Sequence, residues 1–269
     1  MIPGRGLSLG ITLSIVSMVV IAPIAALVLS AVGITPAHLF EAAFSPRALA
    51  AYRLSLLCSL GAAIFDVIAG VAVAAVLVRH REGPARLLNV LVDIPFAIPT
   101  SVAGIALATL YGPNGWLGSW LAERGIAVAY TPLGIAVALA FVGLPFVVRT
   151  VEPVLALLPR DVHEAAESLG AHRLTVLVRV TLPLLLPATL TGFALAFGRM
   201  LGEYGSVIFI AGNLPLRTEI PPLLIMTRLE EYDYTGAAAI ALVSLLASFL
   251  LLLAINALQR RLSVARVMV

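Results

Sequence analysis

Two charged residues late in the chain have a spacing that suits either a salt bridge or contact with an anion. Arg199 and Glu203 are four residues apart, so on a helix they share a face and can pair. Two roles stay open for them. They form a salt bridge that supports packing at a helix end, or Arg199 attracts an anion and Glu203 holds it in place.

Other side chains capable of chemistry are scarce. All 17 basic residues are arginines, and the absence of lysine excludes a phosphate-binding P-loop and Schiff-base catalysis. The single cysteine, Cys58, cannot form an internal disulfide, and the four histidines have no metal-ligand spacing. We therefore expect no catalytic residue, metal or cofactor in this chain. If ATP is used, another chain must bind it.

The composition points to a membrane protein. Hydrophobic residues make up 61% of the 269 residues and charged residues only 12%, whereas soluble domains are nearer one quarter charged. Uncharged or nearly uncharged runs of about 20 residues can cross a bilayer as helices. Six such runs predict an all-α membrane protein of about six transmembrane helices. They are residues 8–31, 54–78, 89–111, 125–148, 180–198 and 234–259.

Breaks within these spans are candidate parts of a translocation path. Pro95 and Pro99 should kink or break the third span, and irregular backbone inside a membrane tends to line a cavity. Gly202 and Gly205, beside Glu203, permit local unwinding or close helix approach. These residues and Arg199 are the candidate gate. Asp66, in the second span, should face the bundle interior, where a structural role is favoured over substrate contact.

The arginines indicate how the chain is oriented. With the N-terminus inside, the inner segments hold eleven arginines and the outer segments five. The positive-inside rule then places both termini in the cytoplasm. The arginines are not massed for nucleic acid, so no nucleic-acid partner is expected.

The longest inner segment carries a spaced motif. Asp161 follows a proline turn and can cap a short helix, which Gly170 can end in a left-handed conformation. The spaced residues are Glu164-Ala165-Ala166, three residues, Gly170, nine residues, Val180, one residue and Leu182-Pro183. This pattern resembles the EAA loop of ATP-binding-cassette (ABC) importer permeases, with Val180 in place of isoleucine.

The resemblance implies a type I importer fold (MetI-like) in which this loop is the coupling helix. Glu164, Ala165, Ala166 and Gly170 would then dock on the ATP-hydrolysing subunit. It also implies two permease chains around one path with an ATPase dimer below. The corresponding divisions are an N-terminal helix and periplasmic loop at 1–50, a transmembrane domain at 51–258 with its coupling loop at 158–183, and a cytoplasmic tail at 259–269.

Four further stretches resemble one branch of that family. They read DIPFAIPTSVAG over 93–104, GRMLGEYGSVIFIAGN over 198–213, TEIPPLLI over 218–225 and LEEYDY over 229–234. They are similar to the T-type permeases of sulfate and thiosulfate importers, and the likeness runs from about residue 10 to 260. Met200 departs from the family, which often has alanine there.

The resemblance implies a non-catalytic permease that moves sulfate, and thiosulfate with it, across a bacterial inner membrane. Its implied partners are the ATPase dimer, a W-type second permease chain, a periplasmic sulfate/thiosulfate-binding protein and membrane lipid. Three alternatives remain. They are a molybdate or tungstate permease, an ion-driven secondary anion transporter, which should show inverted repeats, and a purely structural membrane subunit.

Overall fold

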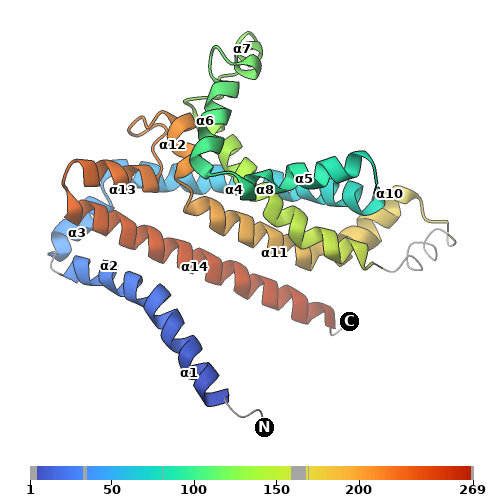
Figure 1. Ribbon diagram of the computed structural model, residues 1–269, viewed down its shortest axis with the longest axis horizontal. Helices are drawn as coiled ribbons and strands as arrows, with labels where there is room; N and C mark the ends of the chain where they lie inside the picture. Colours follow the sequence, from blue (N-terminus) through green and yellow to red (C-terminus); the bar gives the residue numbers. More distant parts are fainter. Residues whose placement is uncertain (1–4, 33–34, 81, 159–167, 169, 268–269) are drawn as a thin grey trace.

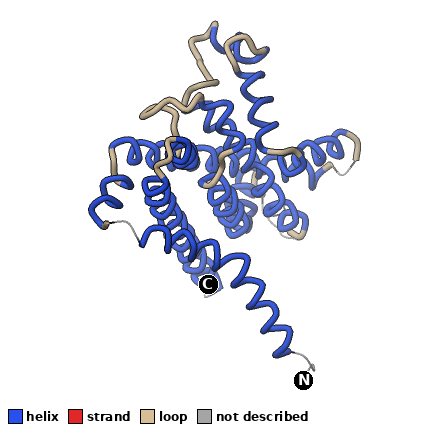
Figure 2. The backbone as a smooth tube through the Cα atoms, turned by 60° about the vertical axis from the view of Figure 1, so that its left-hand side comes forward, coloured by secondary structure: helices blue, strands red, loops and turns tan. Residues whose placement is uncertain are grey.

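The computed structural model describes residues 5–32, 35–80, 82–158, 168 and 170–267. All regular structure in these residues is helical (Figure 2). In chain order the helices are α1 Arg5–Val16, a π-helical turn Ser17–Ile21, α2 Ala22–Val32, α3 Pro36–Ala43, α4 Pro46–Arg79, α5 Pro84–Ala97, α6 Thr100–Tyr111, α7 Trp116–Ala122, α8 Pro132–Ala156, α10 Arg173–Val176, a second π-helical turn Leu177–Thr181, α11 Leu182–Leu201, α12 Gly205–Ala211, α13 Pro221–Glu230 and α14 Tyr234–Val267.

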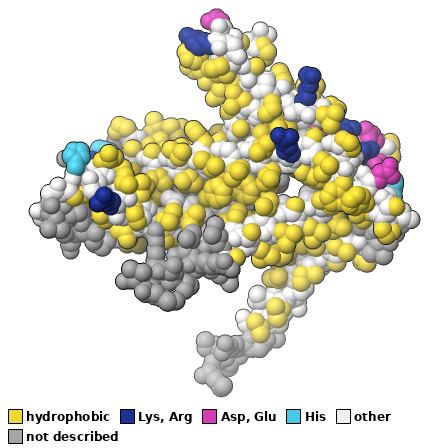
Figure 3. Space-filling model, turned by 180° about the vertical axis from the view of Figure 1, so that it is seen from behind, with side chains coloured by type: hydrophobic (Ala, Val, Ile, Leu, Met, Phe, Trp, Pro, Cys, Tyr) yellow, Lys and Arg dark blue, Asp and Glu magenta, His cyan; other side chains and the backbone are white. Residues whose placement is uncertain are grey.

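Five of these helical segments are long and apolar enough to cross a membrane, and the bent pair α5–α6 makes a sixth candidate. The five segments are Ser8–Ser30, Pro46–Arg79, Pro132–Ala156, Leu174–Leu201 and Tyr234–Ala257. The prediction of an all-α chain with about six spans is therefore confirmed. Hydrophobic side chains are spread widely over the face seen in Figure 3.

Helices α4, α8 and α11 form the centre of the bundle and lie side by side (Figure 1). Glycines bring them close together at Val147 of α8. A Cβ on Gly70 of α4 would lie 2.7 Å from the Val147 Cγ1 atom, and one on Gly192 of α11 would lie 3.0 Å from the Val147 Cα atom. Small residues drive helix association in membranes because they let backbones approach.

The first span is peripheral. No residue in the most apolar window of Ser8–Ser30 is buried. α2 packs beside α14, while α1 runs away from the bundle (Figure 1).

The third span is broken rather than straight. α5 and α6 meet at Ile98 and Pro99 with a bend of 114°. Ile98 adopts extended φ and ψ angles of −99° and 145°, as expected for a residue before proline. Pro95 lies inside α5 without ending it, so of the two prolines only Pro99 stands at the break. The bend directs α6 and α7 out from the row of α4, α8 and α11 (Figure 1), and α6 packs against α12.

Several helix boundaries differ from the predicted spans. α4 begins at Pro46 and α5 at Pro84, both earlier than predicted, and two further boundaries lie at charged residues. α8 begins at Pro132 and continues through Arg149 to Ala156, because side-chain partners surround that arginine. The predicted fifth span begins earlier, with α10 at Arg173, rather than after Arg179. Its π-helical turn precedes Pro183, whose ring cannot donate to the carbonyl four residues earlier, and a wide turn accommodates this loss.

Candidate gate and coupling site

Two helix breaks far apart in sequence lie against each other. The first separates α5 from α6, and the second, at residues 202–204, separates α11 from α12. A Cβ on Gly104 of α6 would lie 2.5 Å from the Ser206 carbonyl oxygen of α12. One on Gly205 would come within contact of the Thr100 hydroxyl and lie 3.2 Å from the Ser101 nitrogen. The two short helices therefore touch backbone to backbone, which only glycine permits at these points.

The predicted pair of Arg199 and Glu203 forms at the second break. The Arg199 Nη1 atom lies 2.8 Å from the Glu203 Oε2 atom. The other carboxylate oxygen, Oε1, accepts from the Ser206 backbone N–H at 2.9 Å and from its hydroxyl at 3.0 Å. The carboxylate thus binds α11 to α12 and satisfies an N–H in the first turn of α12 that has no partner within the helix.

Burial separates the two members of this pair. The Glu203 side chain is 1% exposed and the Arg199 side chain 38% exposed. A buried carboxylate needs a cation and hydrogen-bond donors, and here it has both. The geometry therefore satisfies the structural role in full. It also leaves more than a third of the Arg199 side chain exposed.

Gly202 ends α11 in open space, with no other atom within 4 Å of a Cβ placed there. A cavity of about 500 Å³ runs alongside, between α4, α11, α13 and α14, and Gly198, Leu201 and Gly202 form its α11 wall. The end of α11 therefore has room to move. Of the six predicted gate residues, Pro99, Gly202, Glu203 and Gly205 stand at the two breaks. Arg199 is joined to them through Glu203, and Pro95 lies one turn before Pro99 within α5.

Asp66 faces the bundle interior, as predicted. It is 0% exposed, and neither carboxylate oxygen has a hydrogen-bond partner among the described residues. The space is tight, since a Cβ on Gly143 of α8 would clash with the Asp66 Oδ2 atom. The described residues offer no arginine partner, so the uncharged form is the one that fits this site.

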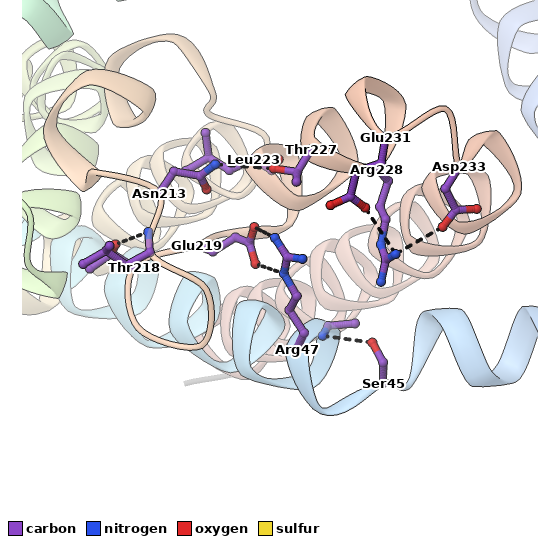
Figure 4. Close-up of polar contacts among 12 residues, drawn as sticks. Ser45, Arg47, Asn213, Thr218, Glu219, Leu223, Thr227, Arg228, Glu231 and Asp233 are labelled. Atoms are coloured by element: carbon purple, nitrogen blue, oxygen red, sulfur yellow. Dashed lines mark hydrogen bonds and ion pairs between the residues drawn. The ribbon is translucent and has the colours of Figure 1, made fainter.

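The end of the bundle that carries α13 is fixed by ion pairs (Figure 4). Arg47, at the start of α4, donates through two nitrogens to Glu219 at 2.7 Å each, and the Glu219 side chain is 1% exposed. Arg228 lies 3.3 Å from Asp233. The Gly236 backbone N–H donates to Asp233 and, with the Thr235 hydroxyl and Arg228, holds the pKa of that carboxyl below its usual value. These contacts brace the segment that follows α12.

The predicted coupling residues Glu164, Ala165 and Ala166 lie outside the described residues. Gly170 is described and has a φ of +79°, the left-handed conformation expected of it. The described helices that flank it in sequence, the end of α8 and α10, lie at the opposite end of the bundle from α13 (Figure 1).

The sequence motifs contained residues whose roles only the structure shows. Gly104 and Ser206 fall within the stretches that suggested the family, but nothing in a single sequence indicates that they touch. Among the residues with described positions, no group of three His, Cys, Asp or Glu side chains could hold a metal ion.

Comparison with known proteins agrees with this arrangement. Residues 66–264 match the family described as "Binding-protein-dependent transport system inner membrane component". The sulfate transport system permease protein CysT of Escherichia coli (strain K12) is 49% identical over 260 residues, 97% of this chain and 94% of that protein. The CysT protein of Synechocystis sp. (strain ATCC 27184 / PCC 6803 / Kazusa) is 43% identical over 250 residues, 93% of this chain and 87% of that protein.

Solved structures share the fold. A chain of a bacterial alginate ABC transporter, crystallised with an alginate pentasaccharide-bound periplasmic protein, superposes with a TM-score of 0.76 at 16% identity and covers 95% of this chain and 93% of that chain. The resemblance to ABC importer permeases, and to their T-type sulfate branch, is confirmed. This chain therefore belongs to the family of binding-protein-dependent transport system inner membrane components and has the fold of the type I ABC importer permeases.

Proposed function

We propose that this chain is a permease subunit of an ABC importer that moves sulfate, and thiosulfate with it, into the cytoplasm. The observation that carries the proposal is the 49% identity to a sulfate permease along nearly the whole chain. The chain forms the path and makes no chemical bond. The gate lies where α6 meets α12, and it is built from Pro95, Pro99, Arg199, Gly202, Glu203 and Gly205.

The energy comes from a separate ATPase dimer. In this proposal Glu164, Ala165, Ala166 and Gly170 form the coupling helix that docks on it, within the loop 158–183. The absence of lysine and the left-handed Gly170 support this assignment. It places both termini in the cytoplasm of a bacterial cell, on the side of the coupling loop. The segments 1–50, 51–258 and 259–269 are then the N-terminal helix and periplasmic loop, the transmembrane domain and the cytoplasmic tail.

A second permease chain completes the path, and we assign it to the W-type relative. The helices α6 and α7 support such a partner because they project outward from the bundle (Figure 1), although α6 remains in contact with α12. Their apolar side chains are open to a neighbour, with Val102 51%, Ile105 50% and Trp116 82% exposed. Sulfate arrives on a periplasmic binding protein.

Reconstitution tests this function. The chain is co-purified with candidate ATPase and second-permease subunits, placed in liposomes with ATP inside, and supplied with sulfate on its binding protein. We expect uptake of radiolabelled sulfate that requires ATP and is blocked by excess thiosulfate. Stronger competition by molybdate than by sulfate would instead identify a molybdate or tungstate permease. Uptake driven by an ion gradient without the ATPase would identify a secondary transporter, and the absence of any uptake would leave a structural subunit.

A further inference from the structure

One arginine joins the two helices that lead to the gate and to the coupling loop. Arg149 of α8 donates to both carboxylate oxygens of Asp93 on α5, from Nε at 2.9 Å and from Nη2 at 2.6 Å. It also donates to the Asn89 side-chain oxygen at 2.8 Å and to the Asn89 carbonyl at 3.2 Å. Within α8 it donates to Glu152 at 2.8 Å. We call these four residues the Arg149 cluster.

The Arg149 cluster is the main polar attachment of α5 to the bundle. Only Ala85 and Val92 of α5 are buried, and both are small or medium in size. A cavity of about 380 Å³ separates the ends of α4, α5 and α8, and Asn89 and Glu152 lie on its wall. Apolar packing at this end of α5 is therefore thin, and the guanidinium carries much of the connection.

The place of the cluster in the chain links two functional sites. Arg149 is seven residues before the end of α8 at Ala156, about 10 Å at the helical rise. The chain beyond α8 enters the loop proposed to dock on the ATPase. Asp93 is five residues before Ile98, where the bend to α6 begins. A displacement of the last turns of α8 can thus reach the gate through the guanidinium, alongside the edge-on contact of Phe96 on α5 with Phe146 on α8.

We propose that Arg149 is the positioning residue that transmits movement of the coupling loop to the gate. The proposal rests on the proposed function and adds the route between its two sites. Arginine suits the task because its planar fork binds a carboxylate through two parallel bonds, which fixes orientation as well as distance. A lysine at this position would keep the charge but not the orientation.

The test separates transport from ATP hydrolysis. R149K and D93N are assembled with the partner chains in liposomes, and sulfate uptake and ATP hydrolysis are measured in the same sample. We expect the sulfate moved per ATP hydrolysed to fall about tenfold in either variant, equivalent to about 1.4 kcal/mol, while hydrolysis continues. R228Q is the matched control, because it removes a paired arginine at the other end of the bundle, and its ratio should equal the wild type.

Each outcome decides the question. An unchanged ratio in both R149K and D93N, with normal assembly, would overturn the transmission role while leaving the importer intact. If R149K fails to co-purify, D93N decides, since it keeps the shape of a side chain that is 49% exposed. Failure of both to assemble would make the cluster a folding element and also overturn the proposal. Lack of ATP-dependent uptake by the wild type would instead contradict the proposed function.

Discussion

Replacing Gly104 with alanine should push α6 and α12, the helices of the proposed gate, apart. The new methyl carbon would lie 2.5 Å from the Ser206 carbonyl oxygen and 2.8 Å from its Cα atom, whereas ordinary contacts begin at 3.4 Å. Both atoms belong to backbone and cannot rotate away, so α6 and α12 must separate by roughly 1 Å at a cost of about 1–3 kcal/mol. A free energy of that size changes the equilibrium constant between two gate conformations by about 5- to 150-fold, in favour of the conformation in which the helices are apart.

The separation can be measured directly with spin labels. Cys58 is replaced first, and labels are placed at two exposed positions, Ile105 on α6 and Arg217 in the segment after α12. In G104A we expect a longer or broader distance distribution than in the parent protein, together with a lower thermal unfolding midpoint. Gly61→Ala is the matched control, because nothing lies within 4 Å of its Cβ position.

The control has the opposite expected sign. Alanine is favoured over glycine within a helix by about 1 kcal/mol, so G61A should leave the label distance unchanged and should not lower the unfolding midpoint. If G104A matches G61A in both measurements, the contact between α6 and α12 does not hold the gate in this conformation, and the reasoning is refuted.

Three further perturbations test other parts of the structure. Glu219→Gln should lower stability by about 2 kcal/mol, because Arg47 loses its charged acceptor, as thermal unfolding in detergent would show, and a change below 0.5 kcal/mol would contradict this. Asp66→Asn should leave sulfate uptake within about twofold of wild type, since the amide has the shape of the uncharged carboxyl; a large loss would indicate a charged role. Asp233 has a lowered pKa, so its stabilisation is present above about pH 4 and is lost as the pH falls through the folded-state pKa. Asp233→Asn should therefore lower the unfolding midpoint at pH 7, and the difference should shrink below pH 4; a difference independent of pH would count against it.

The features that the sequence predicts correctly are those governed by local chemistry. Long uncharged runs must be helical in lipid, so the number of spans follows from hydropathy alone. The pair of Arg199 and Glu203 follows from a spacing of four on one helix. Asp66 must face inward because lipid excludes it.

The features that it misses depend on contacts between distant segments. Pro99 indicates a break, but the 114° turn depends on what α6 packs against. The contact of Gly104 with Ser206 joins residues about one hundred positions apart. Arg149 looks like the first residue beyond a span until Asp93 on a neighbouring helix is seen to bind it. A charged residue therefore indicates the end of a transmembrane helix only when neighbouring helices offer it no polar partner.

The π-helical turn at Leu177–Thr181 lies in the helix between the proposed coupling loop and the proposed gate, where it could let the two ends of that helix rotate relative to each other. A wide turn holds one more residue than an ordinary one, and each residue of an α-helix accounts for about 100° of rotation. If the π-helical turn became an ordinary α-helical turn, α10 (Arg173–Val176) would rotate about the helix axis relative to α11, and the helix would stay continuous. Rotation as well as displacement could then pass along α11 toward Arg199, from the end of the proposed coupling loop that leads into α10 rather than from the end that follows α8.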